Sequence, residues 1–290
     1  MEIKMNSEKN TFRSLGIIYK EESKKGLTHP FFSLVLDSFK AEAEALGYSI
    51  CFINLLNISD DINWNDFCRN SMIEGLCIVC ADFGAENIKT VSESSVPCVT
   101  VDHIYKHVPA VLSDNETGMT RLVEYAIGMG HKKIAFVHGH NNSLVTRTRI
   151  MQFQNVMGYH DLPIPPEYMR EGLYDDVSLT RSIVKELLSL KDRPTCILLP
   201  DDTSYFGAQD AAREMGLSIP DDISFAGYDG IPITQSLLPK LTTIRQNSET
   251  IGSTAARKLI DLIENPKTAR RMPVIYPVEL IEGGTVGRVD

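Results

Sequence analysis

The sequence of 290 residues has no long apolar run and no cluster of basic residues. No stretch approaches the roughly 20 apolar residues that a transmembrane helix needs, and the polar residues 1–10 contain no apolar core of a secretory signal. The formal net charge is −9 at pH 7, whereas phosphate backbones are bound by clustered Lys and Arg. The composition argues against a membrane protein and against DNA binding by this chain itself, and it favours a small ligand.

Signatures of catalysis and of metal binding are missing as well. The sequence contains no G-x-S-x-G nucleophile elbow, no G-x-x-x-x-G-K-[ST] phosphate loop and no H-E-x-x-H. The first expected strand is not followed by G-x-G-x-x-G, which argues against dinucleotide binding. His138 and His140 could supply two metal ligands, but no third ligand stands at a suitable spacing. We therefore expect no enzyme, no cofactor and no metal ion.

Cysteine is scarce, with six residues in the chain. Most stand in apolar, strand-like surroundings, which is typical of buried free thiols in a reducing compartment. Cys77 and Cys80 form a C-x-x-C motif, but residues 76–80 have the pattern of a strand, where this spacing sends the two side chains to opposite faces. A redox or metal pair must converge, so we interpret both thiols as structural and expect a cytoplasmic protein.

Short apolar runs alternate with longer amphipathic stretches, as in α/β proteins with parallel sheets. At Gly47, Gly130 and Gly216 a helical pattern ends just before an apolar run, because glycine accepts the left-handed conformation that closes a helix. The pattern predicts strands over residues 15–19, 48–53, 75–80, 97–101, 110–113, 134–137, 195–199, 223–226 and 274–278, and helices over residues 32–46, 116–128, 145–157, 178–190, 202–215 and 248–264.

The expected strands fall into two successive sets, too many for one compact sheet. The fold class is therefore α/β, with two doubly wound parallel-sheet lobes and helices on both faces of each sheet. The last helix and strand must return across the boundary, so several crossings form a hinge that is suited to closing over a ligand. We expect a polar N-terminal segment (1–13), an N-terminal lobe (14–108 plus about 245–272) and a C-terminal lobe (109–244 plus about 273–290).

Ligands of open parallel sheets bind outside the carboxyl ends of the strands, and this rule selects a short set of side chains. The set combines aromatic rings, carboxylates and one guanidinium, which together hold a polyhydroxylated or heterocyclic ligand. Its members are Phe31, Phe32, Asp102, His138, His140, Arg149, Asp201, Asp202, Tyr228 and Asp229.

Each candidate also has a purely structural interpretation. The two phenylalanines are adjacent in a helix, so only one of them can point toward a ligand. Asp201 or Asp202 could cap the helix that follows, and Asp229 could be a turn residue. Arg149 could lie on a solvated helix face. These residues therefore carry weight only as a set.

Several short motifs follow one another in a specific order. An S-D-N at residues 113–115 precedes an expected helix and the segment GHKKIAF at residues 130–136. Supporting segments are HPFF at 29–32, RTRIMQF at 147–153, PDDISFAGYD at 220–229 and LTTIRQ at 241–246. In this order and spacing the motifs resemble the lactose/galactose-repressor (LacI/GalR) family of transcriptional regulators, from about residue 14 to about residue 285.

The resemblance implies a periplasmic-binding-protein-like fold of type I with an effector between the lobes. The chain departs from the family pattern at two positions. His103 stands where arginine is frequent in the family, and Asp201 stands where asparagine is common. The additional carboxylate favours a hydroxyl-rich or cationic ligand over an anionic one, and a carbohydrate is our first choice. Carried over position by position, the ligand-binding residues are Phe31, Phe32, Asp102, Arg149, Tyr174, Asp201 and Asp229.

Members of this family begin with a helix-turn-helix of about fifty residues, whereas only about thirteen polar residues precede the first expected strand. We therefore expect the ligand-sensing and dimerisation domain of a transcriptional regulator, a homodimer that reaches operator DNA only through a head absent from this chain. The alternative is an extracytoplasmic solute-binding protein that delivers a sugar to a transporter, because it shares the fold.

Overall fold

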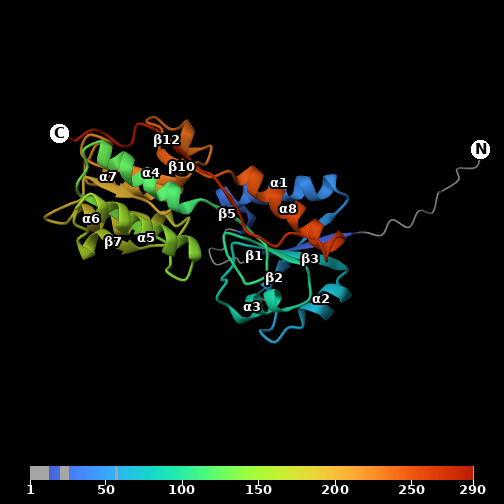
Figure 1. The fold of residues 1–290 in the computed structure, drawn as a ribbon. Coiled ribbons are helices and arrows are strands. Elements are labelled where there is room, and N and C mark those ends of the chain that lie inside the picture. The colour runs from blue at the N-terminus through green and yellow to red at the C-terminus, as the bar shows by residue number, and fades with distance from the viewer. Residues whose placement is uncertain (1–12, 20–25, 56–57, 290) are drawn as a thin grey trace, which may run out of the picture.

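Two lobes, each built on one six-stranded sheet, make up the described part of the chain (Figure 1). The computed structural model describes residues 13–19, 26–55 and 58–289. The predicted polar segment at residues 1–13 therefore lies outside the described residues, except for Arg13. Strands lie in the order β11-β5-β4-β3-β1-β2 in the N-terminal lobe and in the order β12-β10-β9-β8-β6-β7 in the C-terminal lobe.

Neighbouring strands are parallel in both sheets, except that β12 runs antiparallel to β10. The N-terminal sheet consists of β1 (Ser14–Tyr19), β2 (Ser49–Asn54), β3 (Ile73–Val79), β4 (Cys98–Val101), β5 (Ala110–Ser113) and β11 (Val274–Tyr276). The C-terminal sheet consists of β6 (Ile134–His138), β7 (Met169–Glu171), β8 (Cys196–Leu198), β9 (Ser224–Asp229), β10 (Thr242–Arg245) and β12 (Glu279–Ile281).

Helices cover both faces of each sheet, which gives each lobe two hydrophobic cores. The N-terminal sheet lies between α1 (Pro30–Ala45) with α8 (Ser248–Glu264) on one face and α2 (Trp64–Asn70) with α3 (Glu86–Glu93) on the other. The C-terminal sheet lies between α4 (Asn115–Gly128) with α5 (Leu144–Tyr159) and α6 (Val177–Leu188) with α7 (Ser204–Glu214). Single turns of 3-10 helix occur at η1 (Gly26–Thr28), η3 (Pro166–Tyr168) and η4 (Thr234–Ser236). The predicted pair of doubly wound α/β lobes is confirmed.

Local chemistry explains where the helices begin and end. Asp114 caps α4 by accepting a hydrogen bond from the backbone N–H of Thr117 at 2.9 Å, as expected for an N-cap aspartate. Gly47, Gly130 and Gly216 have φ values of 83°, 94° and 70°, the left-handed conformation predicted for them. These joints turn each helix into the next strand, and they place the carboxyl ends of the strands of each sheet along one edge.

Two expected strands belong to a different lobe than predicted. β5 and β11 pair with each other in the N-terminal sheet, although residues 109–244 and 273–290 were assigned to the C-terminal lobe. The expected strand at 274–278 is in fact divided, because β11 ends at Tyr276 and β12 begins at Glu279 in the other sheet. A strand of three or four residues carries no pattern that tells which sheet it joins, so sequence alone could not assign these segments.

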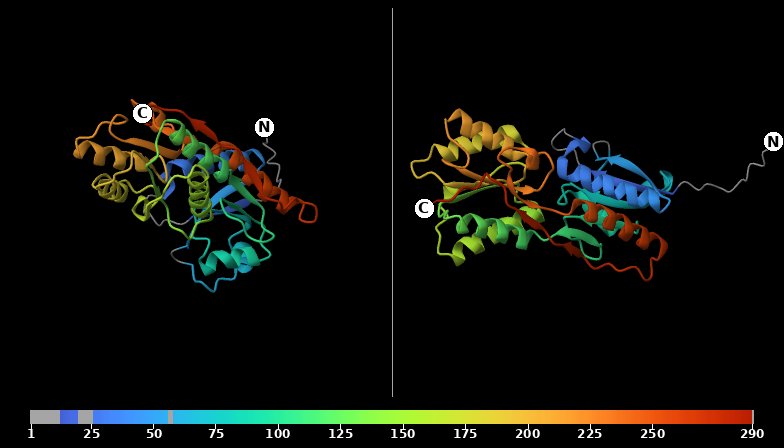
Figure 2. Two further views of the ribbon diagram at one scale, coloured as in Figure 1. Left: turned by 60° about the vertical axis from the view of Figure 1, so that its left-hand side comes forward. Right: turned by 90° about the horizontal axis from the view of Figure 1, so that it is seen from above.

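The chain crosses between the lobes three times. The first crossing follows β5 at Asp114, the second (residues 246–247) joins β10 to α8, and the third (residues 277–278) joins β11 to β12. The backbone N–H of Asp114 donates to the carbonyl of Tyr276 at 2.9 Å, which ties the first crossing to the end of β11. Figure 2 shows segments from the middle and from the end of the sequence passing side by side between the lobes.

The C-x-x-C motif departs from strand geometry at its second cysteine. β3 ends at Val79, and Cys80 has a φ of 50°, so the alternation that predicted opposite faces does not extend to Cys80. Cys77 lies in the core beneath α1 and α8, and Cys80 packs against the same core. Cys77 is a free thiol, and burial raises its pKa well above its usual range.

Candidate functional site

Side chains from both lobes gather around one arginine between the two sheets. Asp102 follows β4 in the N-terminal lobe, whereas Tyr174 follows β7 and Asp229 ends β9 in the C-terminal lobe. All three interact electrostatically with Arg149 in α5, and Asp201 after β8 interacts with Asp229. These five residues, Asp102, Arg149, Tyr174, Asp201 and Asp229, are called the interlobe cluster below.

Arg149 is fixed by the protein on three sides. Only 4% of its surface is exposed, so it does not lie on a solvated helix face. Nε donates to Oδ1 of Asn115 at 2.8 Å and Nη1 donates to the carbonyl of Pro200 at 3.0 Å. The guanidinium carbon lies 3.4 Å from the centre of the Tyr228 ring, a cation–π contact. Burial alone would lower the pKa of Arg149, but the surrounding tyrosines and carboxylates outweigh burial and leave the pKa raised. The side chain is therefore a permanent buried cation.

Asp102 and Asp229 are the two carboxylates of the cluster that face the arginine. Both have positive φ, 60° for Asp102 and 116° for Asp229, and such backbone strain concentrates at functional sites. Burial raises the pKa of Asp102 to about 6, although Arg149 and the backbone N–H of Ser113 lower it. Burial also raises the pKa of Asp229 well above its usual range. Asp102 can therefore change its protonation state near neutral pH.

Asp201 serves mainly to hold the backbone together. Its Oδ2 accepts from the backbone N–H of Asp175 at 2.7 Å, and its Oδ1 accepts from the backbone N–H of Ser204 at 2.8 Å. The second bond satisfies the N–H of the first residue of α7, so Asp201 rather than Asp202 contacts the start of that helix, although the N-cap residue itself is Thr203. The imidazole of His29, in the N-terminal lobe, lowers the pKa of Asp201, which burial raises. Asp201 therefore also contributes an electrostatic contact between the lobes.

Asp202 is fully buried and ties three segments of the C-terminal lobe together. Its carboxylate accepts from the hydroxyl of Thr243 at 2.5 Å, the hydroxyl of Thr234 at 2.9 Å and the backbone N–H of Ile231 at 2.9 Å. Burial raises its pKa to about 7. Because every contact is internal, we interpret Asp202 as a structural residue behind the cluster.

Tyr174 is held in place by its ring and by its hydroxyl group. The hydroxyl shares a hydrogen bond of 2.8 Å with the hydroxyl of Thr146 in α5. A Cβ at Gly139 would lie 2.2 Å from ring atom Cε2 of Tyr174, so only glycine allows the ring to lie against the loop after β6. This packing gives Gly139 a role between the two histidines of the H-G-H segment.

The two phenylalanines at the start of α1 have different surroundings. Phe31 is 3% exposed and belongs to the core of the N-terminal lobe. Phe32 is half-buried, and its ring centre lies 4.9 Å from that of His29. Phe32 is therefore the ring that remains accessible beside the lobe boundary, with Phe31 packed behind it.

Sequence reasoning missed Asn115 and Gln246, which contact two members of the cluster. Asn115 accepts from Arg149, and Gln246 Nε2 donates to Oδ1 of Asp229 at 2.6 Å. Both residues stand in motifs that carried the family resemblance, S-D-N and LTTIRQ. Applying the strand-end rule to β5 and β10, as well as to the other strands, would have selected both.

Metal and membrane chemistry find no support in the described residues. His138 Nδ1 lies 2.8 Å from the carbonyl of Gly139, and His140 Nδ1 lies 2.7 Å from Oε1 of Glu171, so the two histidines have separate partners. Across the described ranges, no three His, Cys, Asp or Glu side chains are grouped to hold a metal ion. No helix in that part of the chain is both long and apolar enough to cross a membrane.

Residues 123–286 match the family of periplasmic binding protein-like domains. The match spans more than half of the chain, and the chain belongs to this family. A relative, the HTH-type transcriptional repressor PurR of Vibrio vulnificus, is 27% identical over 97% of this chain and 83% of its own length.

Solved structures give the same result. The regulatory protein of the LacI family from Chloroflexus aggregans is 25% identical and superimposes with a TM-score of 0.83, covering 94% of this chain and 98% of its own. A LacI family transcriptional regulator from Enterococcus faecium with bound ribose is 23% identical, with a TM-score of 0.79 over 96% of this chain and 100% of its own. This chain is the effector-binding domain of a LacI/PurR-family transcriptional regulator, as the sequence motifs predict. These relatives are transcriptional regulators, and the alternative of a transporter's solute-binding protein gains no support from them.

Proposed function

We propose that this domain binds a small, hydroxyl-rich effector between its lobes, with a carbohydrate as the first choice. The supporting observation is the interlobe cluster, in which Asp102 of the N-terminal lobe and Asp229 of the C-terminal lobe both face Arg149. A ligand that contacts both carboxyls interacts with both lobes, so its affinity depends on their relative arrangement. Such a difference in affinity between two arrangements is what allows an effector to shift the equilibrium between them.

The charge of the cluster favours a neutral ligand with many hydrogen-bond donors. Two carboxyl groups, Asp102 and Asp229, face one guanidinium that already donates to Asn115 and to the Pro200 carbonyl, and the carboxyl of Asp201 interacts with Asp229. An anionic ligand would meet more like charge than opposite charge. Hydroxyl groups can donate to a carboxylate or accept from a protonated carboxyl, so they suit buried carboxyls such as Asp102 and Asp229. Phe32 and Tyr174 offer ring faces for the apolar side of a sugar.

Two buried polar atoms beside Asp102 and Asp229 also support a ligand at the interlobe cluster. Ser113 Oγ and Gln246 Oε1 have no hydrogen-bond partner among the described residues. The backbone N–H of Ser113 donates to Asp102, and the amide of Gln246 donates to Asp229. Buried polar groups are nearly always paired in folded proteins, so these two atoms support a polar ligand next to the two carboxyls.

In the whole regulator, we propose that effector binding changes affinity for operator DNA through a helix-turn-helix of the kind that the relatives carry. The regulator acts as a cytoplasmic homodimer and needs no cofactor. A two-fold dimer would present two such heads to two half-sites of an operator. Sedimentation of the purified chain tests the dimer.

A thermal-shift screen tests the effector proposal. The chain is heated with a panel of pentoses, hexoses and disaccharides, and with nucleobases and amino acids as competing classes. A ligand at 100 times its dissociation constant stabilises the folded state by about 2.7 kcal/mol. We expect stabilisation by at least one sugar, and loss of that effect in Arg149→Ala. Gln152→Ala, on the same helix, should keep it.

The same screen can contradict the proposal. Stabilisation by a nucleobase alone or an amino acid alone would replace the carbohydrate with another class of effector. No shift with any compound, in a chain that is folded and monodisperse, would remove the support for an effector site at this cluster. Any ligand that stabilises the chain is also checked for turnover, because detectable product would show an enzyme.

A further inference from the structure

The two residues that sequence reasoning missed lie where the chain passes from one lobe to the other. Asn115 directly follows the first crossing and is the first residue of α4, whereas Gln246 begins the second crossing. Both side chains are buried, with 7% and 6% of their surface exposed. Each is hydrogen-bonded to a different charged member of the interlobe cluster, which makes the crossings part of the site.

Asn115 connects Arg149 to the end of the N-terminal sheet. Its Oδ1 accepts from Arg149 Nε at 2.8 Å, and its Nδ2 donates to the carbonyl of Ser113, the last residue of β5, at 3.1 Å. The backbone N–H of Ser113 in turn donates to Oδ1 of Asp102 at 3.4 Å. A chain of hydrogen bonds therefore runs from Asp102 in one lobe through the first crossing to Arg149 in the other.

Gln246 holds Asp229 at two points. Its backbone N–H donates to the Asp229 carbonyl at 3.1 Å, and its Nε2 donates to Oδ1 of Asp229 at 2.6 Å. The second bond fixes the orientation of the amide group, because only the nitrogen can donate to a carboxylate. Oε1 then points away from Asp229, buried and without a partner among the described residues. Gln246 also lines a cavity of about 490 Å³ beside the second and third crossings.

We propose that Asn115 and Gln246 are positioning residues of the effector site: they hold Arg149 and Asp229 and fix both groups to crossings of the hinge. This inference rests on the proposed function, because it assigns the two held groups to an effector. Movement of either charged group toward a ligand must move a crossing residue with it. A displacement of Arg149 or Asp229 is thus transmitted to the hinge through its hydrogen bond to Asn115 or Gln246, and not through packing alone.

Variants that separate hydrogen bonding from packing test the proposal. Asn115→Leu and Gln246→Met keep comparable volume and lose the bonds, whereas Asn115→Asp keeps an oxygen for Arg149 Nε. Gln152→Ala is the matched control, since this amide joins α5 to α4 through Thr120 at 2.7 Å without touching the cluster. For any sugar that stabilises the wild type, we expect at least tenfold weaker binding in Asn115→Leu and Gln246→Met and near-normal binding in Gln152→Ala. Asn115→Asp should show a smaller loss than Asn115→Leu, because it keeps the acceptor for Arg149 Nε but loses the donor to the Ser113 carbonyl. Normal binding in Asn115→Leu and Gln246→Met would overturn the proposal.

Hydrogen exchange without any ligand gives a second, independent readout. Arg149→Met and Asp229→Ala remove the held groups, so we expect at least tenfold faster amide exchange in peptides covering residues 113–118 and 245–249, respectively, and no change there in Gln152→Ala. Exchange within twofold of the control in both variants would overturn the positioning role. If no compound in the panel binds while this coupling is present, the effector proposal fails and the link between cluster and crossings stands.

Discussion

Asp102→Asn isolates the titration of one carboxyl between the lobes. Asparagine has nearly the same shape as aspartate and tolerates the left-handed φ of 60° at this position. Its amide oxygen can still accept from the backbone N–H of Ser113, as the carboxylate does at 3.4 Å. The substitution therefore removes chiefly a charge, at a carboxyl whose pKa burial raises from 3.8 to about 6.

The raised pKa fixes both the sign and the size of the effect. Well below pH 3.8 the carboxyl is protonated in the folded and unfolded chains and costs nothing, and at pH 4 the cost is still small. As the pH rises to about 6, the unfolded chain ionises first, so the wild type loses stability. At about 1.4 kcal/mol per tenfold change in proton affinity, the interval from 3.8 to about 6 corresponds to about 3 kcal/mol. We expect Asp102→Asn to be more stable than the wild type by up to about 3 kcal/mol at pH 7 and nearly equal to it near pH 4.

Urea denaturation at intervals between pH 4 and pH 7 measures this difference. The fluorescence of Trp64, the one tryptophan of the chain, reports unfolding because the ring is 2% exposed. Asp37→Asn, at an exposed position of α1, is the control and should show no such trend. A difference that stays constant across this pH range, or a variant that is less stable than the wild type at pH 7, would refute the reasoning. Arg149→Met should move the titration of Asp102 upward, because Arg149 lowers its pKa.

Three further substitutions test the packing and the ionisation of buried groups. A Cβ in Gly118→Ala would lie 2.2 Å from the hydroxyl of Tyr228, so we expect a loss of about 1–3 kcal/mol in unfolding free energy, which Tyr228→Phe in the same chain should largely restore. Gly252→Ala places a Cβ 2.1 Å from the Val35 carbonyl of α1; it should destabilise the chain by at least about 1–3 kcal/mol, while Ser253→Ala on the same helix should not. His131 is buried and burial lowers its pKa below 6.5, so the wild type should lose stability as the pH falls below 6.5 and His131→Gln should lose less. Urea denaturation of each variant, at the stated pH for His131, decides all three.

The sequence predicted the larger elements because their patterns are long. α8 begins and ends at the predicted residues, and α5 differs from its prediction by one or two residues at each end. The pattern left α2, α3, β7 and β12 unassigned, since they have only three to eight residues and lack the continuous apolar run that marked the equally short β4 and β8. In so few residues, neither a helical nor an alternating period repeats often enough to be distinguished.

The part of the site that could be predicted from the sequence is the part that follows directly from the order of strands and helices. Asp102 and Asp229 were found because each follows or ends a parallel strand of its own sheet, and Arg149 because it lies in the helix after β6, a rule that needs only the order of the elements. The different roles of Asp201 and Asp202 depend on which backbone N–H groups lie within about 3 Å of each carboxylate. No sequence pattern predicts these contacts. Asn115 and Gln246 were missed because the strand-end rule was not applied to β5 and β10, although both residues lie within two positions of the ends of those strands.

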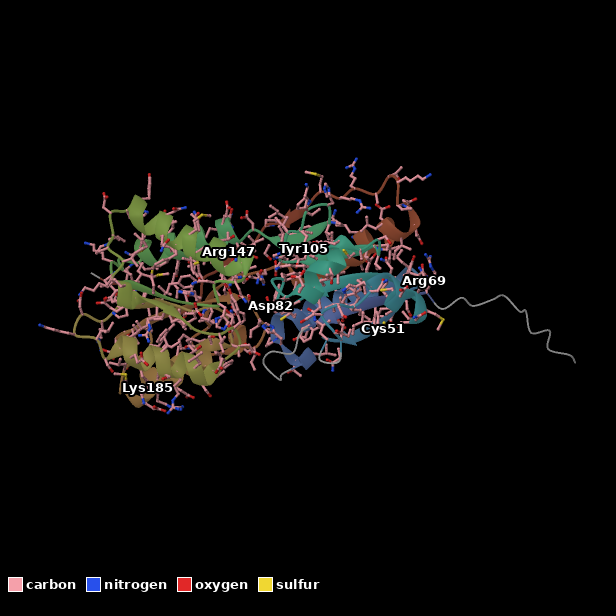
Figure 3. The ribbon with its side chains drawn as sticks, turned by 90° about the horizontal axis from the view of Figure 1, so that it is seen from below. Cys51, Arg69, Asp82, Tyr105, Arg147 and Lys185 are labelled. Carbon is pink, nitrogen blue, oxygen red and sulfur yellow. The ribbon has the colours of Figure 1, made fainter. Side chains whose placement is uncertain are left out.

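The third crossing also determines which fragments of the chain could contain a complete lobe. β11 and β12 are separated by only two residues and belong to different sheets, and α8, near the end of the described chain, packs against α1 near its beginning. In Figure 3, Tyr105 lies in the N-terminal lobe and Arg147 lies in the C-terminal lobe. No cut in the chain can release one lobe with all of its strands and helices, since each lobe borrows a segment from beyond the other. The two halves are therefore separate in shape but not in sequence, and a fragment of either would lack part of its own core.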